Sequence, residues 1–340
     1  METDDANDIL FVGFNQDAGW FACGTDNGFK IFNTDKFNNT FSREFDGGIG
    51  IVAMLFRWNI LALVGGGSKP KYSPDKVMIW DDNQSKCIGE LKYKSSVKGV
   101  KMNKETIAVV LQDRIYVYEF SNLKIRDAIE TYDNPDGLWC LSAKKDTNVL
   151  VCPDKEKGKI RIVINENFST VEAHDGAIAW LSLNFDGTLV ATASEKGTLV
   201  RIFNTLTGTK VQEVRRGADP AKIYSIAISG NDLLAVTSDK GNVHVYNLDS
   251  TTEEKTEEKT TNTKSIFGFM KGVLPTYFSS EWSFAQFKFW SDTKVVYTAC
   301  AFTNEHKLVL ISIKGDYHLL EINKTDKTIT STAHLMINAE

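Results

Sequence analysis

Two adjacent arginines, Arg215 and Arg216, are the residues of this sequence best suited to bind an anion. They lie between a segment with strand-like alternation and a turn marked by Pro220. Adjacent side chains on an extended backbone point to opposite faces, so the two guanidinium groups should not serve one partner together. Each guanidinium presents a planar fork of donors that matches phosphate oxygens. The pair therefore indicates two anion sites, one on each side of a strand.

Two turn motifs, one on either side of the pair, repeat the same set of polar residues. TASEKGTLVRIF (192–203) aligns with TSDKGNVHVY (237–246), and each offers a hydroxyl before the turn, a small hydrogen-bonding residue and a cationic or titratable side chain on the next strand. The first predicted site contains Ser194, Thr198, Arg201 and Arg215, and the second contains Arg216, Ser238, Asn242 and His244. Because imidazole is charged only when protonated, we expect the second site to bind anions better at mildly acidic pH.

A structural interpretation of the arginine pair competes with this one. Arginines at strand edges are usually solvated or bridged to carboxylates, and Glu213 and Asp219 are close in sequence. Such a pair taken alone favours the structural interpretation. The repeated set of polar residues favours binding instead.

Composition excludes several classes of protein. A chain of 340 residues with 42% hydrophobic content can form a substantial core, and no apolar run reaches the roughly 20 residues of a membrane helix. The five cysteines are scattered without a C-x-x-C pair, so we expect no disulfide framework, no metal site and no cofactor. The net charge of −5 argues against a nucleic-acid partner. The acidic start of the chain lacks signal-peptide features, which favours a cytoplasmic protein.

A short pattern recurs seven times: a polar turn with Gly or Asp, then alternating apolar residues that usually end in an aromatic one. The copies end at Phe32, Trp80, Tyr118, Val163, Phe203, Tyr246 and Leu320. Successive ends lie about 48, 38, 45, 40, 43 and 74 residues apart, which brackets the roughly 40 to 45 residues of a four-stranded propeller blade except in the last interval. The pattern predicts an all-β, seven-bladed β-propeller over residues 1–340. The alternative, a pair of β-sandwiches, does not explain the sevenfold motif.

The long last interval predicts a flexible insertion in blade six, residues 249–281. Its first part, DSTTEEKTEEKTTNTK, is charged and of low complexity. Apolar residues follow, several of them at helical spacing: Ile266, Phe267, Phe269, Met270, Val273, Leu274, Tyr277 and Phe278. This segment either packs on the propeller, with the chain from Trp282 onward as the next blade's first strand, or inserts at a membrane interface. The sequence leaves both interpretations open.

Longer stretches around these motifs resemble the PROPPIN family, the WIPI proteins of animals and the swollen-vacuole homologues of yeast. The resemblance rests on VRRGADPAKIYSIAIS, AHDGAIAWLSLNFDGTLVATASEKGTLVRIF and LLAVTSDKGNVHVY, and it extends over essentially the whole chain. GGGSKPKYSPDKVMIWDD (65–82) is similar to the signature of the yeast HSV-type subgroup. Val214 departs from the usual Phe or Leu of the family, and Asn242 stands where many members have Thr.

The resemblance implies a function, a location and partners. It implies binding of PtdIns3P and PtdIns(3,5)P2 in the two predicted sites, without a stated preference, and a blade-six loop that dips into the bilayer. It further implies a monomeric, non-enzymatic recruitment module on endosomal, vacuolar and pre-autophagosomal membranes. The alternative is a protein scaffold with incidental lipid affinity, and the family implies an autophagy lipid-transfer protein as partner at early-blade loops near Lys69 to Asp82. No catalytic motif is found, and whether residues 9–14 complete the last blade stays open.

Overall fold

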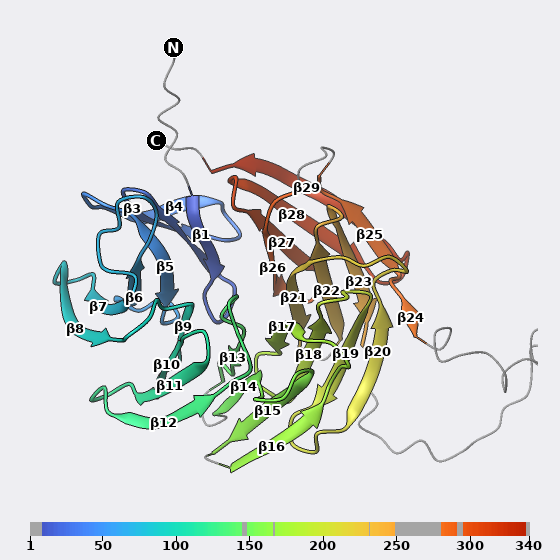
Figure 1. Ribbon diagram of the computed structural model, residues 1–340. Coiled ribbons are helices and arrows are strands. Elements are labelled where there is room, and N and C mark those ends of the chain that lie inside the picture. The colour runs from blue at the N-terminus through green and yellow to red at the C-terminus, as the bar shows by residue number, and fades with distance from the viewer. Residues whose placement is uncertain are drawn as a thin grey trace, which may run out of the picture.

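Seven β-sheets stand around a central axis in the computed structural model of this protein (Figure 1). The structure describes residues 9–144, 148–165, 167–230, 232–248, 280–290 and 295–337. The regular secondary structure in these ranges consists of β-strands, and each sheet is one blade of a propeller. The predicted all-β class and the seven-bladed propeller are therefore confirmed.

The first four blades are each antiparallel sheets of four consecutive strands. Blade one contains β1 (Ile9–Phe14), β2 (Trp20–Thr25), β3 (Gly28–Asn33) and β4 (Asn38–Glu44). Blade two contains β5 (Ile49–Met54), β6 (Ile60–Gly65), β7 (Lys76–Asp81) and β8 (Lys86–Lys92). Blade three contains β9 (Gly99–Met102), β10 (Thr106–Val110), β11 (Arg114–Glu119) and β12 (Ile125–Glu130). Blade four contains β13 (Cys140–Leu141), β14 (Val149–Pro153), β15 (Lys159–Ile164) and β16 (Asn167–Glu172).

Blades five and six share a more complex chain path, and blade seven is again four consecutive strands. Blade five contains β17 (Ile178–Leu183), β18 (Leu189–Ser194), β19 (Leu199–Asn204), β20 (Lys210–Arg215) and β24 (Glu281–Trp282). Blade six contains β21 (Ile223–Ser229), β22 (Leu233–Ser238), β23 (Asn242–Asn247) and β25 (Ala285–Lys288). Blade seven contains β26 (Thr298–Asn304), β27 (Lys307–Ser312), β28 (Asp316–Asn323) and β29 (Thr328–Met336).

The seven sequence motifs all mark the same place in their blades, the turn into the third strand and that strand itself. Phe32 lies in β3, Tyr246 in β23 and Leu320 in β28, and the other four motif ends lie in β7, β11, β15 and β19. Second strands are almost entirely buried because neighbouring blades pack on both of their faces, as in β10 and β22. Fourth strands are largely exposed, but β20 ends in buried Val214 and Arg215.

The chain returns to blades five and six after residues 249–279, which lie outside the described residues. β24 then pairs in parallel with β20, joining Val214 to Glu281 and Arg215 to Trp282. β25 follows and becomes the outer strand of blade six, antiparallel to β23. The expectation that the chain from Trp282 onward forms the first strand of the next blade is therefore wrong. The physical reason is that the outer edges of β20 and β23 offer backbone groups for β24 and β25 to pair with.

Side-chain packing closes the ring. β1 pairs with β2 inside blade one and β29 with β28 inside blade seven, so residues 9–14 do not complete the last blade. Phe21 and Cys23 of blade one instead form one hydrophobic cluster with Val309 and Tyr317 of blade seven. The Tyr317 hydroxyl donates to the Thr34 carbonyl oxygen at 2.7 Å across this seam.

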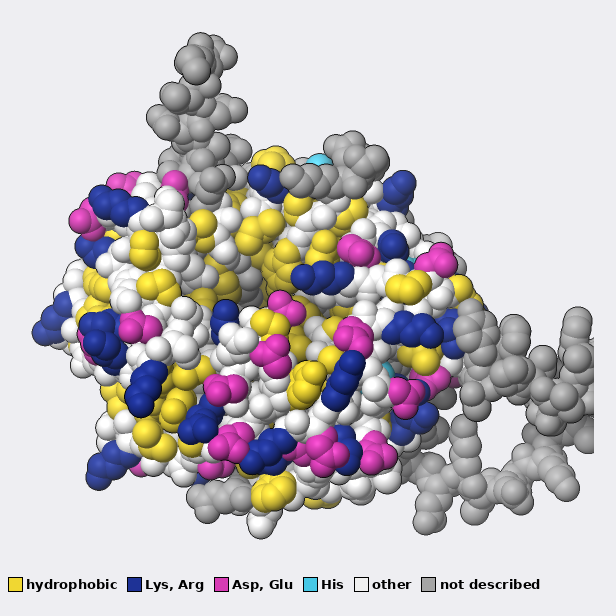
Figure 2. All heavy atoms as spheres, viewed as in Figure 1, with side chains coloured by type: hydrophobic (Ala, Val, Ile, Leu, Met, Phe, Trp, Pro, Cys, Tyr) yellow, Lys and Arg dark blue, Asp and Glu magenta, His cyan; other side chains and the backbone are white. Residues whose placement is uncertain are grey.

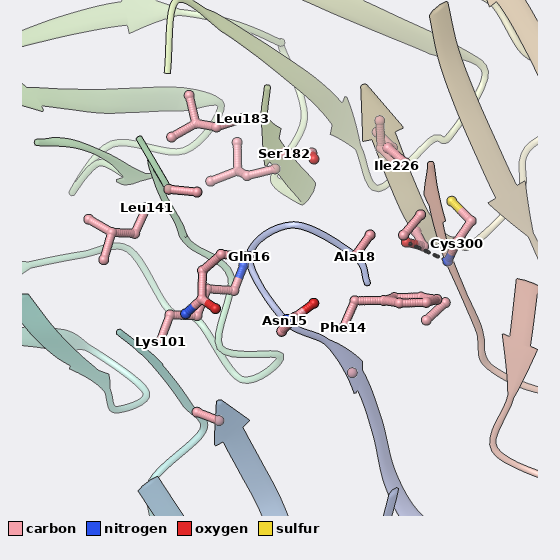
Figure 3. A pocket seen from close by; sticks show the side chains of 18 of the residues that line it. Phe14, Asn15, Gln16, Ala18, Lys101, Leu141, Ser182, Leu183, Ile226 and Cys300 are labelled. Carbon is pink, nitrogen blue, oxygen red and sulfur yellow. Dashed lines mark hydrogen bonds between the residues drawn. The ribbon is translucent and has the colours of Figure 1, made fainter. Parts of the chain in front are cut away.

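A hollow of about 770 Å³ runs along the axis, lined by the inner strands of all seven blades (Figure 2). The turn after β1 enters it, and Figure 3 shows Asn15, Gln16 and Ala18 on that turn. The Gln16 side chain donates to the Met54 and Met102 carbonyl oxygens and accepts from the Phe56 amide, each at 2.7 Å. Gln16 thereby ties blades one, two and three together.

No helix in the described ranges is long and apolar enough to cross a membrane.

Candidate functional site

The two predicted sites start from two tight turns at the rim, each of which leads into a third strand. Gly197 in the first turn has φ +61°, and a Cβ built on it would lie 1.8 Å from the Ala221 carbonyl oxygen. Gly241 in the second turn has φ +75°. Glycine tolerates both the positive φ and the close approach of backbone, so these turns can place polar side chains at the blade surface.

Arg215 and Arg216 lie on opposite faces of blade five. Val214 is fully buried in the cluster shared by blades five and six. Arg215 follows it on β20 and therefore points to the other face, which also carries Glu213. The Arg216 guanidinium lies on the blade-six side, where its charge acts on His244. The structure thus separates the two arginines as the strand geometry predicts.

The first set of residues faces blade four. Arg201 pairs with Glu213 across β19 and β20, and Leu199 pairs with Arg215 two residues further along. The Arg201 side chain donates from Nε to Glu213 Oε2 at 2.8 Å and from Nη1 to the Ala173 carbonyl oxygen, at the end of blade four, at 2.7 Å. Glu213 is therefore bridged to Arg201.

Ser194 and Thr198 frame this set at the turn. Ser194 is the last residue of β18 and is half-buried, and its carbonyl oxygen accepts from the Gly197 amide. Thr198 lies just before β19 and is buried, and its carbonyl oxygen accepts from the Arg216 amide at 2.9 Å. Thr198 thus contacts the backbone of Arg216, which belongs to the second predicted site.

The second set of residues centres on Arg216, which is 5% exposed. Its guanidinium donates to the carbonyl oxygens of Gly197, at 2.9 Å from Nε, and of Asp219. Burial lowers the pKa of Arg216, and the nearby Tyr246 side chain and the carboxylates of Asp239 and Asp219 partly offset this effect. Carbonyl groups satisfy hydrogen bonds without neutralising the charge, so a buried cation faces blade six.

Blade six presents Ser238, Asn242 and His244 toward this cation. Ser238 is fully buried and His244 is 6% exposed. Asn242 begins β23, and its buried Oδ1 has no hydrogen-bond partner among the described residues. Asp239 Oδ1, in the same turn, is buried and likewise accepts no hydrogen bond from the described part of the chain. The second set therefore offers a cation and two buried acceptors, which suits a ligand with both phosphate and hydroxyl groups.

His244 does not behave as the sequence suggests. Burial lowers its pKa from 6.5 to about 4, and the nearby Arg216 charge acts in the same direction. The ring is therefore neutral at mildly acidic pH. The expectation that the second site gains a cation under those conditions is wrong, because desolvation and a like charge both disfavour imidazolium.

The return of the chain adds residues that sequence reasoning missed. Lys288 of β25 is the cross-strand partner of Asn242, so both lie on the face toward blade five. The Ser283 Oγ lies 3.2 Å from His244 Nδ1, and the Ser280 Oγ donates to Glu213 Oε1 at 2.6 Å. No signal in the sequence fixes these pairings, because the insertion hides the register of β24 and β25.

The predicted membrane-inserting residues, Ile266 to Phe278, lie outside the described residues. Within the described ranges, no group of three or more His, Cys, Asp or Glu side chains is arranged to hold a metal ion.

Comparison with known families decides the membership of this chain. The family model described as PROPPIN matches residues 9–327, from β1 to the end of β28, so that only β29 of the described strands lies outside it. The chain belongs to the PROPPIN family. Members of this family are autophagy-related propellers that bind phosphoinositides, so the resemblance seen in the sequence is confirmed.

Individual PROPPIN relatives agree in sequence and in fold. Autophagy-related protein 18e of Arabidopsis thaliana is 38% identical over 94% of this chain and 84% of its own length. SVP1-like protein 2 of Pichia angusta is 36% identical over 84% of this chain and 81% of its own. The solved structure of Kluyveromyces lactis Hsv2 superposes with a TM-score of 0.80 at 26% identity, covering 98% of this chain and all of that one.

Proposed function

We propose that this PROPPIN is a non-enzymatic peripheral membrane protein that binds PtdIns3P and PtdIns(3,5)P2 through two rim pockets. The first pocket contains Ser194, Thr198, Arg201 and Arg215, and the second contains Arg216, Ser238, Asn242 and His244. The protein would dock edge-on and recruit other factors to endosomal, vacuolar and pre-autophagosomal membranes.

One observation carries this proposal: the Arg216 guanidinium is buried, and among the described residues its hydrogen bonds go to the backbone carbonyl oxygens of Gly197 and Asp219. A buried cation is costly unless an anion compensates it. Asp239 and Asp219 offset the burial of this charge only in part, so a phosphate placed there would stabilise it further, while inositol hydroxyls could donate to Asn242 Oδ1. The opposite orientation of Arg215 supports a second, separate pocket on the other face of the same blade.

Avidity would make weak pockets sufficient. Two pockets and an inserting segment, Ile266 to Phe278, on one rigid propeller bind a membrane through effective concentration rather than through one tight contact. The blade-six segment would add burial of apolar side chains at the interface, each CH₂ contributing about 0.8 kcal/mol.

Vesicle flotation tests the proposal. Wild-type protein should float with phosphatidylcholine vesicles that contain PtdIns3P or PtdIns(3,5)P2, and the Arg215→Thr/Arg216→Thr variant should stay at the bottom of the gradient. Arg114→Thr, on the rim of blade three, is the matched control, because Arg114 pairs with Glu130 far from both pockets. Equal flotation of the double variant and the wild type would refute the proposal.

A protein-binding role at blade two is a second candidate. The connection between β6 and β7, residues 66–75, is the longest of the seven links between a second and a third strand and is mostly exposed. The solved structure of KlAtg21 with the coiled coil of AgAtg16 is a complex of a propeller with the same fold, at 22% identity. Membrane localisation in cells that lack the 3-phosphoinositide kinase separates the two roles: it vanishes if lipid binding recruits the protein and persists if a protein partner does.

A further inference from the structure

The first pocket contains a carboxylate of its own. Glu213 lies on the blade-four face of β20, in the same cross-strand row as Arg201 and next to the row of Arg215. Its side chain is 17% exposed and lies 2.8 Å from Arg201 Nε. A phosphate that accepts a hydrogen bond from Arg201 Nε must therefore displace the Glu213 carboxylate, which already accepts from that nitrogen.

Glu213 has other partners to keep if a phosphate takes Arg201. Its Oε1 accepts from the Ser280 hydroxyl at 2.6 Å, and its Oε2 lies 3.5 Å from Lys210 Nζ. Burial alone would raise the pKa of Glu213, but the hydrogen bonds from Ser280 and Arg201 outweigh it and hold the pKa below its usual value. The carboxylate thus stays charged, and Ser280 and Lys210 can retain it after Arg201 has turned to a ligand.

The charge of the competitor sets which lipids can displace it. A phosphomonoester carries about −1.5 to −2 at pH 7, whereas the phosphodiester of an ordinary anionic lipid carries −1. Exchanging the Glu213 carboxylate for a phosphodiester replaces one single charge with another and gains little. Exchanging it for a phosphomonoester gains additional charge next to Arg201 and Arg215.

We propose that Glu213 is a specificity-determining residue: a resident carboxylate that keeps phosphodiester lipids out of the first pocket and yields only to phosphomonoesters. Ser280, at the point where the chain returns from the blade-six insertion, holds the displaced carboxylate. This inference rests on the proposed function, because it assigns a role within the first headgroup pocket.

Two variants test this proposal: one should add binding to a phosphodiester lipid, and the other should weaken binding of the headgroup. Glu213→Gln keeps the size and can still accept from Arg201 and hydrogen-bond Ser280, but it removes the competing charge. Ser280→Ala leaves every charge in place and removes the partner that would retain the displaced carboxylate. Both variants are made in an Arg216→Thr background, so that the measured binding comes from the first pocket alone. Glu130→Gln in the same background is the control. Glu130 pairs with Arg114 and Lys155 at the rim of blades three and four.

The readout is co-sedimentation with phosphatidylcholine vesicles that contain either PtdIns3P or phosphatidylinositol, which differ by one phosphomonoester. We expect Glu213→Gln to lower the preference for PtdIns3P by about tenfold, mainly through new, salt-sensitive binding to phosphatidylinositol vesicles. We expect Ser280→Ala to weaken binding of soluble inositol 1,3-bisphosphate severalfold in calorimetry. Glu130→Gln should match its parent on both measures.

An unchanged lipid preference in folded Glu213→Gln would overturn the inference, and so would unchanged headgroup affinity in Ser280→Ala. Should Glu213→Gln lose its cooperative thermal transition, Ser280→Ala still decides. If the proposed function itself is wrong, the result is different: the Arg216→Thr parent and the Arg215→Thr/Arg216→Thr variant would then bind PtdIns3P vesicles equally.

Discussion

Arg215 and Arg216 are neighbours in the chain, yet one faces blade four and the other faces blade six. Val214, between the blade-five and blade-six sheets, fixes this alternation, because its burial in the shared cluster leaves Arg215 only the opposite face. The buried hydroxyl of Tyr246 donates to the Arg215 carbonyl oxygen at 3.0 Å and holds the strand end in place. One dipeptide can therefore contribute a guanidinium group to each of the two proposed pockets, which lie on opposite faces of blade five.

Single arginine changes should remove one pocket each. Arg216→Thr is expected to reduce the number of inositol 1,3-bisphosphate molecules bound, measured by calorimetry, from two to one, and Arg215→Thr should do the same. On PtdIns3P vesicles each change should cost at least tenfold in affinity, because avidity multiplies the two sites. Binding of two headgroups by either single variant would contradict the separation of the pockets.

Acid should destabilise the propeller through its buried histidines. Burial lowers the pKa of His244 and of His318 from 6.5 to about 4. The unfolded chain therefore takes up protons as pH falls below about 6.5 while the folded chain does not, so stability present at pH 7 is lost between pH 6.5 and 4. Each histidine contributes on the order of 1 to 3 kcal/mol over that window.

Urea unfolding at pH 7.5, 5.5 and 4.5 measures this effect. His318→Gln should reduce the dependence of the unfolding free energy on pH, because it removes one of these groups. Headgroup binding by the second pocket should show no gain between pH 7 and 5.5, since His244 stays neutral there. A clear gain over that range would show that its ring is protonated.

Two glycines next to Arg216 should tolerate alanine very differently: Gly197, whose carbonyl oxygen accepts from its guanidinium, and Gly217, which follows it in the chain. Gly197→Ala places a Cβ 1.8 Å from the Ala221 carbonyl oxygen at a φ of +61°, so it should cost about 1 to 3 kcal/mol and disturb the first turn. Gly217→Ala has no atom within 4 Å of the added Cβ. Its free energy of unfolding should lie within a few tenths of a kcal/mol of the wild-type value. Thermal melts of both variants give the comparison.

Removing the Tyr246 hydroxyl should loosen the end of β20. The hydroxyl is buried and donates to the Arg215 backbone, so Tyr246→Phe should cost about 1 kcal/mol of unfolding free energy. Headgroup affinity should fall in both pockets, because both arginines are carried by that strand end. Loss from one pocket only would show that Tyr246 positions a single arginine.

The fold was predictable because each blade repeats one local signal. The turn and third strand of every blade carry the same alternation, and all seven copies lie where a propeller requires them. The separation of Arg215 and Arg216 was predictable for a similar reason, since it depends only on the two-residue period of an extended strand.

Other parts of the candidate site depend on packing that no local pattern encodes. The two-residue β24 has no period to detect, and its parallel pairing with β20 depends on the path of the chain after the insertion. Lys288 lies opposite Asn242 because β25, which follows the insertion, pairs with β23. The pKa of His244 depends on burial and on Arg216, which are properties of the assembled blades.

Because side chains close the ring, the blade at which the chain begins is dispensable. No β-ladder of the described residues joins blade one to blade seven, and Phe21 meets Tyr317 there in the kind of hydrophobic seam found between the other blades. A circular permutant in which blade four comes first should therefore still form all seven sheets. It would carry the arginine pair in the second blade of its chain, and the proposed pockets would form unchanged around that pair.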